Sequence, residues 1–229
     1  MSPKGSRQSR GRSTPMPSDR SAGLDAVTID AFGTLVELEN PISRLRAALA
    51  ERDVNSDEAS VAAAFAAEVE YYLVHKSEGR DTASLLDLRT RCAGVFLGGV
   101  APDLDETEFA PAFVDALVFR PLDGAVPALR KLRRAGLELA CVSNWDVGIG
   151  EQLERAGLGA YLSAIVSSAE TGAEKPDPRV FEEALSRLGV SPKRALHIGD
   201  EDADRAGAQA AGLRFEPAPL GTLPERLGL

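Results

Sequence analysis

The sequence predicts an α/β protein: a three-layer, Rossmann-like core built on a parallel sheet, with an α-helical segment inserted near its start. Two observations support this fold class. After Pro121, short apolar runs alternate with helix-like stretches, the pattern of parallel strands joined by right-handed helical crossovers. From about residue 41 to residue 119 the chain is rich in alanine and helical in pattern, which predicts an inserted helical bundle.

The first strand is expected at residues 26–29, an apolar and partly β-branched run that ends at Asp30. Such a run is typical of a strand buried on both faces, and Gly33 permits a tight turn beside the carboxylate. Ligands of open α/β sheets bind at the carboxyl ends of the strands, so Asp30 is predicted to lie where chemistry takes place. The alternative is that Asp30 only begins a turn.

Four helices are expected in the inserted segment. Val61, Phe65, Val69 and Tyr72 recur at steps of three and four, which predicts one apolar face on the second helix. Asp81 and Asp105 mark helix starts, because a carboxylate there accepts hydrogen bonds from free backbone N–H groups. The four helices are predicted at residues 42–52, 57–76, 83–97 and 105–118.

The remaining elements follow from the alternating pattern after residue 121. Gly136 and Gly157 each end a helix, as glycine commonly does. Helices are predicted at residues 125–135, 147–156, 178–188 and 204–211, and strands at residues 137–142, 164–167 and 195–198.

The composition is that of an ordinary globular protein, with 229 residues, 44% of them hydrophobic and 27% charged. A net charge of −9 argues against nucleic acid and anionic membranes as partners. Residues 1–22 hold five basic side chains and one acidic one, so we expect a disordered basic tail there. That segment lacks the apolar run of a secretory signal or a membrane span. Cys92 and Cys141 form no spaced framework, which favours a reducing, cytoplasmic setting.

Polar residues stand where the predicted strands end. Asp30 follows the first strand, Ser143 and Asn144 end the second, Lys175 lies beyond the third, and Asp200 follows the fourth. Each residue type alone is common in turns or on surfaces. Because the carboxyl ends of parallel strands meet at one edge of a sheet, the ordered set indicates a single site.

The order and local context of these residues resemble the haloacid dehalogenase-like hydrolase superfamily over roughly residues 25–216. The resemblance implies that Asp30 is the nucleophile, that Ser143 and Lys175 bind the transferred group, and that Asp200 is an acidic metal ligand.

It also implies that the inserted helices form a cap of the subfamily I kind. The chain is then expected to divide into a core of residues 23–40 and 120–229 and a cap of residues 41–119, with the active site at their junction. Cap closure is expected to exclude water and select the substrate.

The chemistry of these residue types agrees with the roles. A carboxylate can attack phosphorus to form a covalent ester that water then hydrolyses. Mg²⁺ takes one or two carboxylates plus substrate oxygens, so Asp30 and Asp200 are predicted to bind Mg²⁺. The resemblance implies the backbone carbonyl of Phe32 as a further ligand. Lys175, Ser143 and the Asn144 amide are predicted to contact a small, phosphorylated substrate.

Phe32 departs from the family pattern. Phosphatases of the superfamily usually carry a second Asp at this place, which protonates the leaving group and later activates water. A positioned acid or base is worth about 10²- to 10⁴-fold in rate, so a slow enzyme or one that needs a good leaving group, such as an acyl phosphate, is expected. Asp146 is a hypothetical replacement for the missing acid.

Two other functions stay open at this point. An aromatic residue in the sequence Asp-Ala-Phe-Gly-Thr-Leu also resembles the 2-haloacid dehalogenase branch, where halide leaves without a proton. The acidic cluster that begins at Asp200 instead attracts Mg²⁺ and repels a carboxylate substrate, which favours the phosphatase. A catalytically silent metal- or ligand-binding protein is the third function, and the retained Asp30, Lys175 and Asp200 count against it.

Several neighbours of the motifs have alternative roles. Asp204 is expected either to touch the metal or to cap the helix that begins near it. His197 lies in a predicted buried strand and is expected to be a satisfied core histidine rather than a catalytic one. Trp145 either walls the substrate pocket or packs. The sequence carries no signal for the identity of the substrate or for an oligomeric state.

Overall fold

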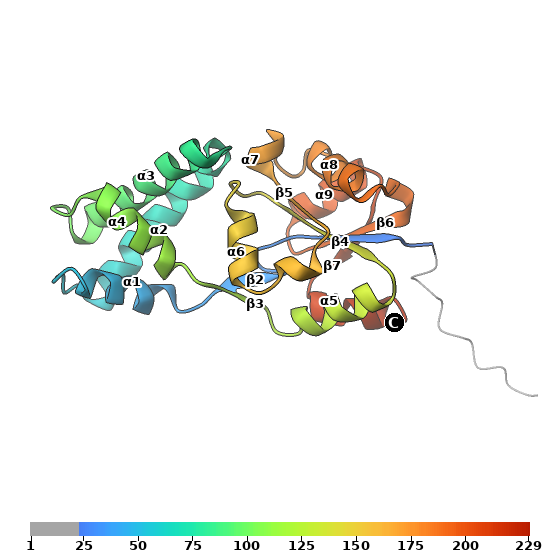
Figure 1. Cartoon of the computed structure of the whole chain (residues 1–229), viewed down its shortest axis with the longest axis horizontal. Helices are drawn as coiled ribbons and strands as arrows, with labels where there is room; N and C mark the ends of the chain where they lie inside the picture. Colours follow the sequence, from blue (N-terminus) through green and yellow to red (C-terminus); the bar gives the residue numbers. More distant parts are fainter. Residues whose placement is uncertain (1–22) are drawn as a thin grey trace, which may run out of the picture.

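The computed structural model describes residues 23–229, and the predicted basic tail, residues 1–22, lies outside the described residues (Figure 1). Its centre is a five-stranded sheet in the order β5-β4-β1-β6-β7, with every neighbouring pair parallel. The predicted α/β class and parallel sheet are therefore confirmed. The strands are β1 (Ala26–Ile29), β4 (Glu138–Ser143), β5 (Ala164–Ser167), β6 (Ala195–Gly199) and β7 (Arg214–Pro217).

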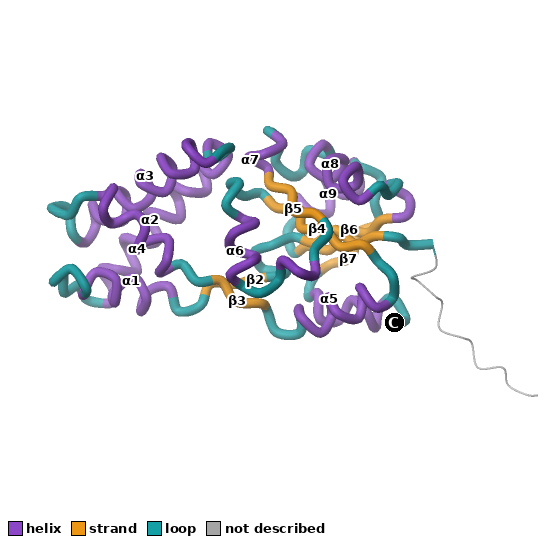
Figure 2. The backbone as a smooth tube through the Cα atoms, viewed as in Figure 1, coloured by secondary structure: helices purple, strands orange, loops and turns teal. Residues whose placement is uncertain are grey.

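Helices cover both faces of this sheet (Figure 2). Side chains of β1 alternate between the faces, so Val27 and Ile29 join one apolar cluster while Ala26 joins another. The first cluster includes Leu129 of α5, and the second includes Phe181 of α8. The helices of the first face are α5 (Ala125–Arg134), α6 (Ile149–Arg155) and α10 (Leu223–Arg226), and those of the second are α8 (Arg179–Leu188) and α9 (Asp202–Ala210). A short helix, α7 (Ser168–Thr171), follows β5.

A separate group of helices lies beyond the carboxyl edge of the sheet (Figure 1). They are α1 (Pro41–Ala50), α2 (Glu58–His75), α3 (Thr82–Val100) and α4 (Glu106–Ala116), called the helical unit below. Its own apolar core centres on Phe96, whose ring lies 6.1 Å from that of Phe109 and 5.3 Å from that of Phe113. Asp81 and Asp105 cap α3 and α4 as predicted.

Within residues 23–229, no helix combines the length with the apolar character that a membrane crossing demands.

Three strands are absent from the sequence-based assignment. Val36–Leu38 (β2) and Phe119–Pro121 (β3) pair antiparallel where the chain enters and leaves the helical unit. Each has only three residues, and the partner lies some eighty residues away, so local pattern gives no signal. The third is β7, an edge strand that pairs with β6. Its charged residues and proline are untypical of a strand, so its sequence does not predict one.

The predicted apolar face of α2 is partly wrong. Val61 is buried, and Phe65 and Tyr72 pack on the core of the helical unit, but the other buried positions are Ala64 and Glu68. The buried face of α2 is therefore shifted by one position from the predicted apolar face. It includes Ala64 because this small side chain lets α3 approach closely. Gly99 of α3 confirms this closeness, since a Cβ there would lie 2.8 Å from Cβ of Ala64.

Glu68 is a carboxyl group inside this core, with 4% of its surface exposed. Burial raises the pKa of Glu68 to about 7, and a hydrogen bond with Cys92 opposes that shift only in part. A group whose folded pKa lies above its unfolded value binds its proton more strongly when folded. The contribution of Glu68 to stability therefore falls as the pH rises from about 4.5 to about 7.

We predict that Glu68→Gln raises the free energy of unfolding on the order of 2 kcal/mol at pH 7, because each pKa unit is worth about 1.4 kcal/mol and glutamine stays neutral. At pH 5 the gain should be much smaller, since wild-type Glu68 is then protonated in the folded state. Urea unfolding at both pH values measures this difference. Glu70→Gln, on the exposed side of the same helix, is the control, and an equal gain at both pH values for Glu68→Gln would contradict the assignment.

Candidate active site

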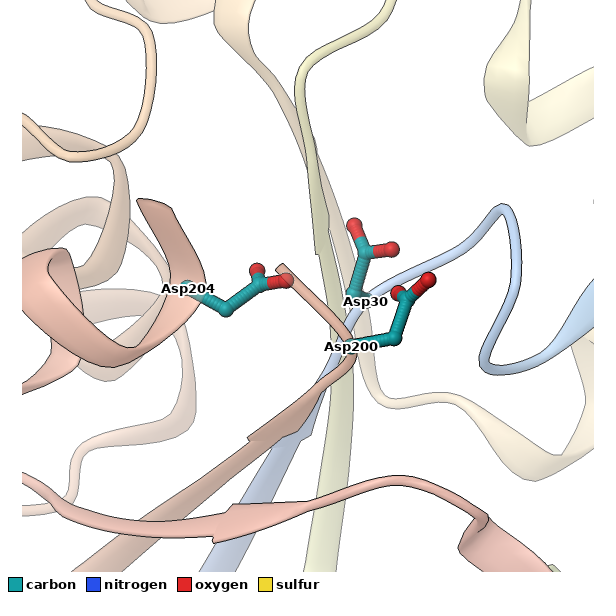
Figure 3. A group of neighbouring side chains, drawn as sticks. All are labelled: Asp30, Asp200 and Asp204. Atoms are coloured by element: carbon teal, nitrogen blue, oxygen red, sulfur yellow. The ribbon is translucent and has the colours of Figure 1, made fainter. Parts of the chain in front are cut away.

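The carboxyl ends of three adjacent strands bring the predicted site residues together. In the register of the sheet, Ile29 of β1 pairs with Cys141 of β4 and with Ile198 of β6, so the residues that follow emerge side by side. Asp30 is buried, with 6% of its surface exposed. Figure 3 shows Asp30 and Asp200 rising from neighbouring strand ends while Asp204 approaches from α9.

Lys175 joins the group from the loop between α7 and α8. Its Nζ lies 2.5 Å from Oδ1 of Asp30 and 2.6 Å from Oδ1 of Asp204, and all three side chains are buried. The Ser143 hydroxyl donates to the same Asp30 oxygen at 3.1 Å. One oxygen of Asp30 thus receives both an ammonium and a hydroxyl, which orients the carboxylate.

Opposing effects set the protonation of this cluster. Burial raises the pKa of Asp30, with a further rise from Asp204, while the charge of Lys175 lowers it. Burial by itself would lower the pKa of Lys175, but the two carboxylates bring it above its ordinary value, so the ammonium stays charged. Burial also raises the pKa of Asp204, yet the hydrogen bond from His197 and the charge of Lys175 bring it below its usual range. Asp204 is therefore held as a carboxylate.

Asn144 holds the loop that carries Lys175. Its Oδ1 accepts the backbone N–H of Lys175 at 2.7 Å, and its Nδ2 donates to the carbonyl of Lys175 at 3.1 Å. This pairing fixes the backbone from which the lysine extends. In the structure the amide serves the lysine loop, and its contact with substrate stays a prediction.

The carboxylates of Asp30, Asp200 and Asp204 offer oxygens within 4.8 Å of one another, the spacing of a metal-binding group. Their availability differs. Asp204 already accepts from Lys175, from His197 and from the backbone N–H of Glu201. Asp200 is exposed and accepts only the Thr34 hydroxyl, at 3.1 Å, among the hydrogen bonds and ion pairs of the described residues. Asp30 and Asp200 thus supply the free oxygens, whereas Asp204 serves as a partner of Lys175 and in the capping box of α9.

The loop after β1 presses against Asp200. Gly33 has a φ of 80°, and a Cβ at that position would lie 2.4 Å from Oδ2 of Asp200. Only glycine accommodates both the left-handed backbone and this close approach. Phe32, in the same loop, exposes 52% of its surface. The aromatic side chain is therefore open to solvent.

The helical unit contacts the core next to these residues. The Tyr72 hydroxyl of α2 donates to Oδ2 of Asp146 at 2.8 Å, and Lys76 forms an ion pair with Glu174 at 3.3 Å. Burial raises the pKa of Asp146, which favours its protonated form. The sequence predicts Tyr72 only as part of the apolar face of α2 and assigns no role to Glu174. Nothing local marks such contacts, since the partner of Tyr72 lies 74 positions away in the chain.

His197 and Trp145 have structural roles in the fold. His197 is fully buried and hydrogen-bonded on both ring nitrogens, to Thr28 at 2.9 Å and to Asp204 at 3.0 Å, as expected of a satisfied core histidine. Trp145 packs edge-on against Phe119, with ring centroids 5.1 Å apart, so packing accounts for its position.

Comparison with known proteins decides the family. A family model for haloacid dehalogenase-like hydrolases matches residues 24–212, most of the chain. This chain belongs to the haloacid dehalogenase-like hydrolases.

Relatives of this hydrolase in sequence share part of its length. It is 39% identical over 102 residues to haloacid dehalogenase-like hydrolase domain-containing protein 3 of Mus musculus, which covers 44% of this chain and 41% of that protein. It is 41% identical over 96 residues to the glyceraldehyde 3-phosphate phosphatase of Methanopyrus kandleri, covering 41% of each. The matched region thus spans about two fifths of the length of these relatives.

A solved structure shares the fold over nearly the whole hydrolase. The magnesium-bound HAD-hydrolase YfnB of Bacillus subtilis superposes with a TM-score of 0.69, covering 90% of this chain and 99% of the other at 19% identity. At this identity the likeness shows the fold alone.

We predict that Lys175→Met lowers the free energy of unfolding by about 3 kcal/mol at pH 7, because it leaves the buried carboxylates of Asp30 and Asp204 without their cation. The loss should be smaller at pH 5, where the unpaired carboxylates gain protons more readily. The double variant Lys175→Met/Asp204→Asn should recover part of the loss. Chemical denaturation measures these differences with the exposed Lys193→Met as control, and a loss that is independent of pH would contradict the pairing.

Proposed function

We propose that this hydrolase is a Mg²⁺-dependent phosphatase that acts on a small phosphorylated metabolite with Asp30 as its nucleophile. The observation that carries the proposal is the convergence of Asp30, Asp200 and Lys175 at one sheet edge, with Lys175 and Ser143 both on Oδ1 of Asp30. A phosphate dianion needs cationic and hydroxyl partners near the attacking carboxylate, and this set supplies them. The relative from Methanopyrus kandleri, named a phosphatase, supports the same choice.

The carboxylates fit a magnesium ion. Mg²⁺ prefers oxygen ligands and usually takes one or two carboxylates with the substrate phosphate and waters. Asp30 and Asp200 would hold it, together with the backbone carbonyl of Phe32, while Asp204 remains with Lys175. When bound, the ion neutralises charge on the phosphoryl oxygens.

The reaction then has two steps, in which each residue has its own role. An oxygen of Asp30 forms a bond to phosphorus as the bond from phosphorus to the leaving oxygen breaks, giving an aspartyl phosphate. Lys175 and Ser143 donate to the phosphoryl oxygens and hold the carboxylate in line. Water then attacks phosphorus, which releases inorganic phosphate and regenerates Asp30.

Phe32 restricts the leaving groups. Its side chain has no proton to give, so the alkoxide of an alkyl phosphate would have to leave without a proton from position 32. An acyl phosphate releases a carboxylate and an aryl phosphate a phenolate, and these anions are stable without a proton. Asp146 carries a raised pKa but its carboxylate contacts Tyr72 and Gly148. Asp146 remains a hypothetical general acid. Full activity of an Asp146→Asn variant would rule out this role.

We propose further that residues 41–119 act as a cap on a core of residues 23–40 and 120–229. The contacts between Tyr72 and Asp146 and between Lys76 and Glu174 support this proposal, because they join the helical unit to segments next to Ser143 and Lys175. In that position a cap would select the substrate. A reducing, cytoplasmic location is part of the same proposal, supported by Cys92 and Cys141 being free and buried.

Phe32 also favours a second candidate, a hydrolase of 2-haloacids. Halide needs no proton to leave, so the same Asp30 could attack carbon and displace it without an acid at position 32. The exposed Asp200 beside Asp30, which forms no ion pair with another residue of 23–229, weighs against a carboxylate substrate in the absence of a metal. A silent binding protein is the third outcome that the following experiment separates.

We expect purified protein to release phosphate from acyl and aryl phosphates only with Mg²⁺, measured on a panel that also holds alkyl phosphates and 2-haloacids. Asp30→Asn should lower the rate by at least about a thousandfold, since the nucleophile is lost. Asp200→Asn should raise the Mg²⁺ concentration for half-maximal rate by about tenfold, while the exposed neighbour Asp202→Asn should not. Metal-independent halide release would establish the dehalogenase, and silence on every substrate would contradict both enzymes.

We predict that Phe32→Asp raises kcat for alkyl phosphates by about 10- to 100-fold, because it restores a carboxyl that can protonate the leaving oxygen. The first step on acyl phosphates, measured as single-turnover formation of the aspartyl phosphate, needs no proton and should change little. Phe32→Asn is the matched control, with similar shape and no acidic proton. Equal gains in both variants would show that side-chain size, not proton transfer, limits the reaction.

A further inference from the structure

Four buried polar side chains form a hydrogen-bonded column that ends at Asp30: Thr28, His197, Asp204 and Lys175. They come from β1, β6, α9 and the loop before α8, and each has less than a tenth of its surface exposed. Thr28 Oγ1 lies 2.9 Å from Nδ1 of His197, whose Nε2 lies 3.0 Å from Oδ1 of Asp204. The same Asp204 oxygen accepts Lys175 Nζ at 2.6 Å, and Lys175 reaches Asp30 at 2.5 Å.

The chemistry of Asp204 fixes the direction of its bond with His197. An ionised carboxylate can only accept hydrogen bonds, so Nε2 of His197 must carry the proton and donate. The other Asp204 oxygen accepts the backbone N–H of Glu201 at 3.1 Å. Both oxygens are thereby engaged, and Asp204 cannot turn without losing a donor.

His197 is itself held in place. Thr28 contacts Nδ1 and also lies 3.4 Å from the carbonyl of Leu196, so this hydroxyl ties the imidazole to the strand pair. The ring of Phe181 meets the imidazole edge-on at a centroid distance of 4.8 Å. The imidazole is therefore oriented by the strand pair and by α8, not by the loop that carries Lys175.

We propose that His197 is a positioning residue: its Nε2–H holds Asp204 in the orientation that keeps the Lys175 ammonium on Oδ1 of Asp30. Lys175 stands between two carboxylate oxygens, and its place depends on where the Asp204 oxygen lies. If Nε2 no longer donates, that oxygen keeps Lys175 as its one remaining donor and draws the ammonium away from Asp30. The catalytic consequence rests on the proposed function, whereas the effect on Lys175 does not.

The rival explanation is that His197 only fills space between Phe181 and Phe215. Two substitutions separate the explanations. His197→Gln places an amide N–H near the position of Nε2 and loses the ring, whereas His197→Leu retains apolar bulk and loses the donor. If His197 only packs, His197→Leu should resemble wild type more closely than His197→Gln does. If His197 positions Asp204, His197→Gln should resemble wild type more closely.

The first measurement observes Lys175 directly, by proton–nitrogen correlation spectroscopy of the lysine ammonium groups in the full chain. Lys175→Met identifies the Lys175 signal by its disappearance. We expect this signal to stay close to its wild-type shift in His197→Gln and to move or vanish in His197→Leu. The proposal is overturned by the reverse order, by equal changes in both variants, or by a wild-type imidazole spectrum in which Nδ1 carries the only ring proton.

Thr28→Val tests the column without altering the histidine. It removes the hydroxyl on Nδ1 and should displace the Lys175 signal less than His197→Leu does, with Thr28→Ser close to wild type. An unchanged Lys175 signal in His197→Leu, together with a folded thermal transition, would also overturn the proposal.

The second measurement is kinetic. On the best substrate of the panel, His197→Leu should lower kcat by about tenfold with KM nearly unchanged, and His197→Gln should retain activity within about threefold. A variant His197→Leu at least as active as His197→Gln contradicts the positioning role. If wild type is silent on the whole panel, the proposed function fails and the ammonium spectra alone decide on His197.

Discussion

The buried ammonium of Lys175 is the interaction on which the rest of the site depends. Asp30 and Asp204 are both out of contact with bulk water, and two buried carboxylates facing one another are costly without a cation between them. Lys175 supplies it at hydrogen-bond distance from each. Because that lysine sits on a loop, the fold must hold the loop still, and Asn144 does so through two hydrogen bonds to the Lys175 backbone.

Asp30 and Asp200 differ in burial and in hydrogen-bond partners. Asp30 is enclosed by donors from neighbouring elements and lies under the helical unit, while Asp200 projects outward with the Thr34 hydroxyl beside it. Gly33 approaches Asp200 so closely that a Cβ there would lie 2.4 Å from Oδ2 of Asp200. A buried carboxylate and an exposed one thus have oxygens within 4.8 Å of each other.

The helical unit is tied to the core at points that flank these carboxylates. Tyr72 contacts Asp146, three residues beyond Ser143, and Lys76 contacts Glu174, the neighbour of Lys175. Each contact therefore connects α2, or the residue that follows it, to a segment that also carries a site residue. A substrate held between the helical unit and the sheet would meet both.

The sequence alone predicts the parallel α/β core, the inserted helices, the places of Asp30, Ser143 and Asp200 at strand ends and that of Lys175 beyond the third predicted strand, because the signals for these features are local. Hydrophobic period, capping aspartates and glycine stops act over a few residues, and the order of motifs needs no geometry. Only the tertiary structure decided how Asn144 and Asp204 are used. Both bond Lys175, 31 and 29 residues away, and a side chain's hydrogen bonds depend on which segments the fold brings beside it. The pairing of β2 with β3 and the contacts of Thr28 with His197 and of Lys175 with Asp30 join residues more than eighty positions apart, which no local pattern records.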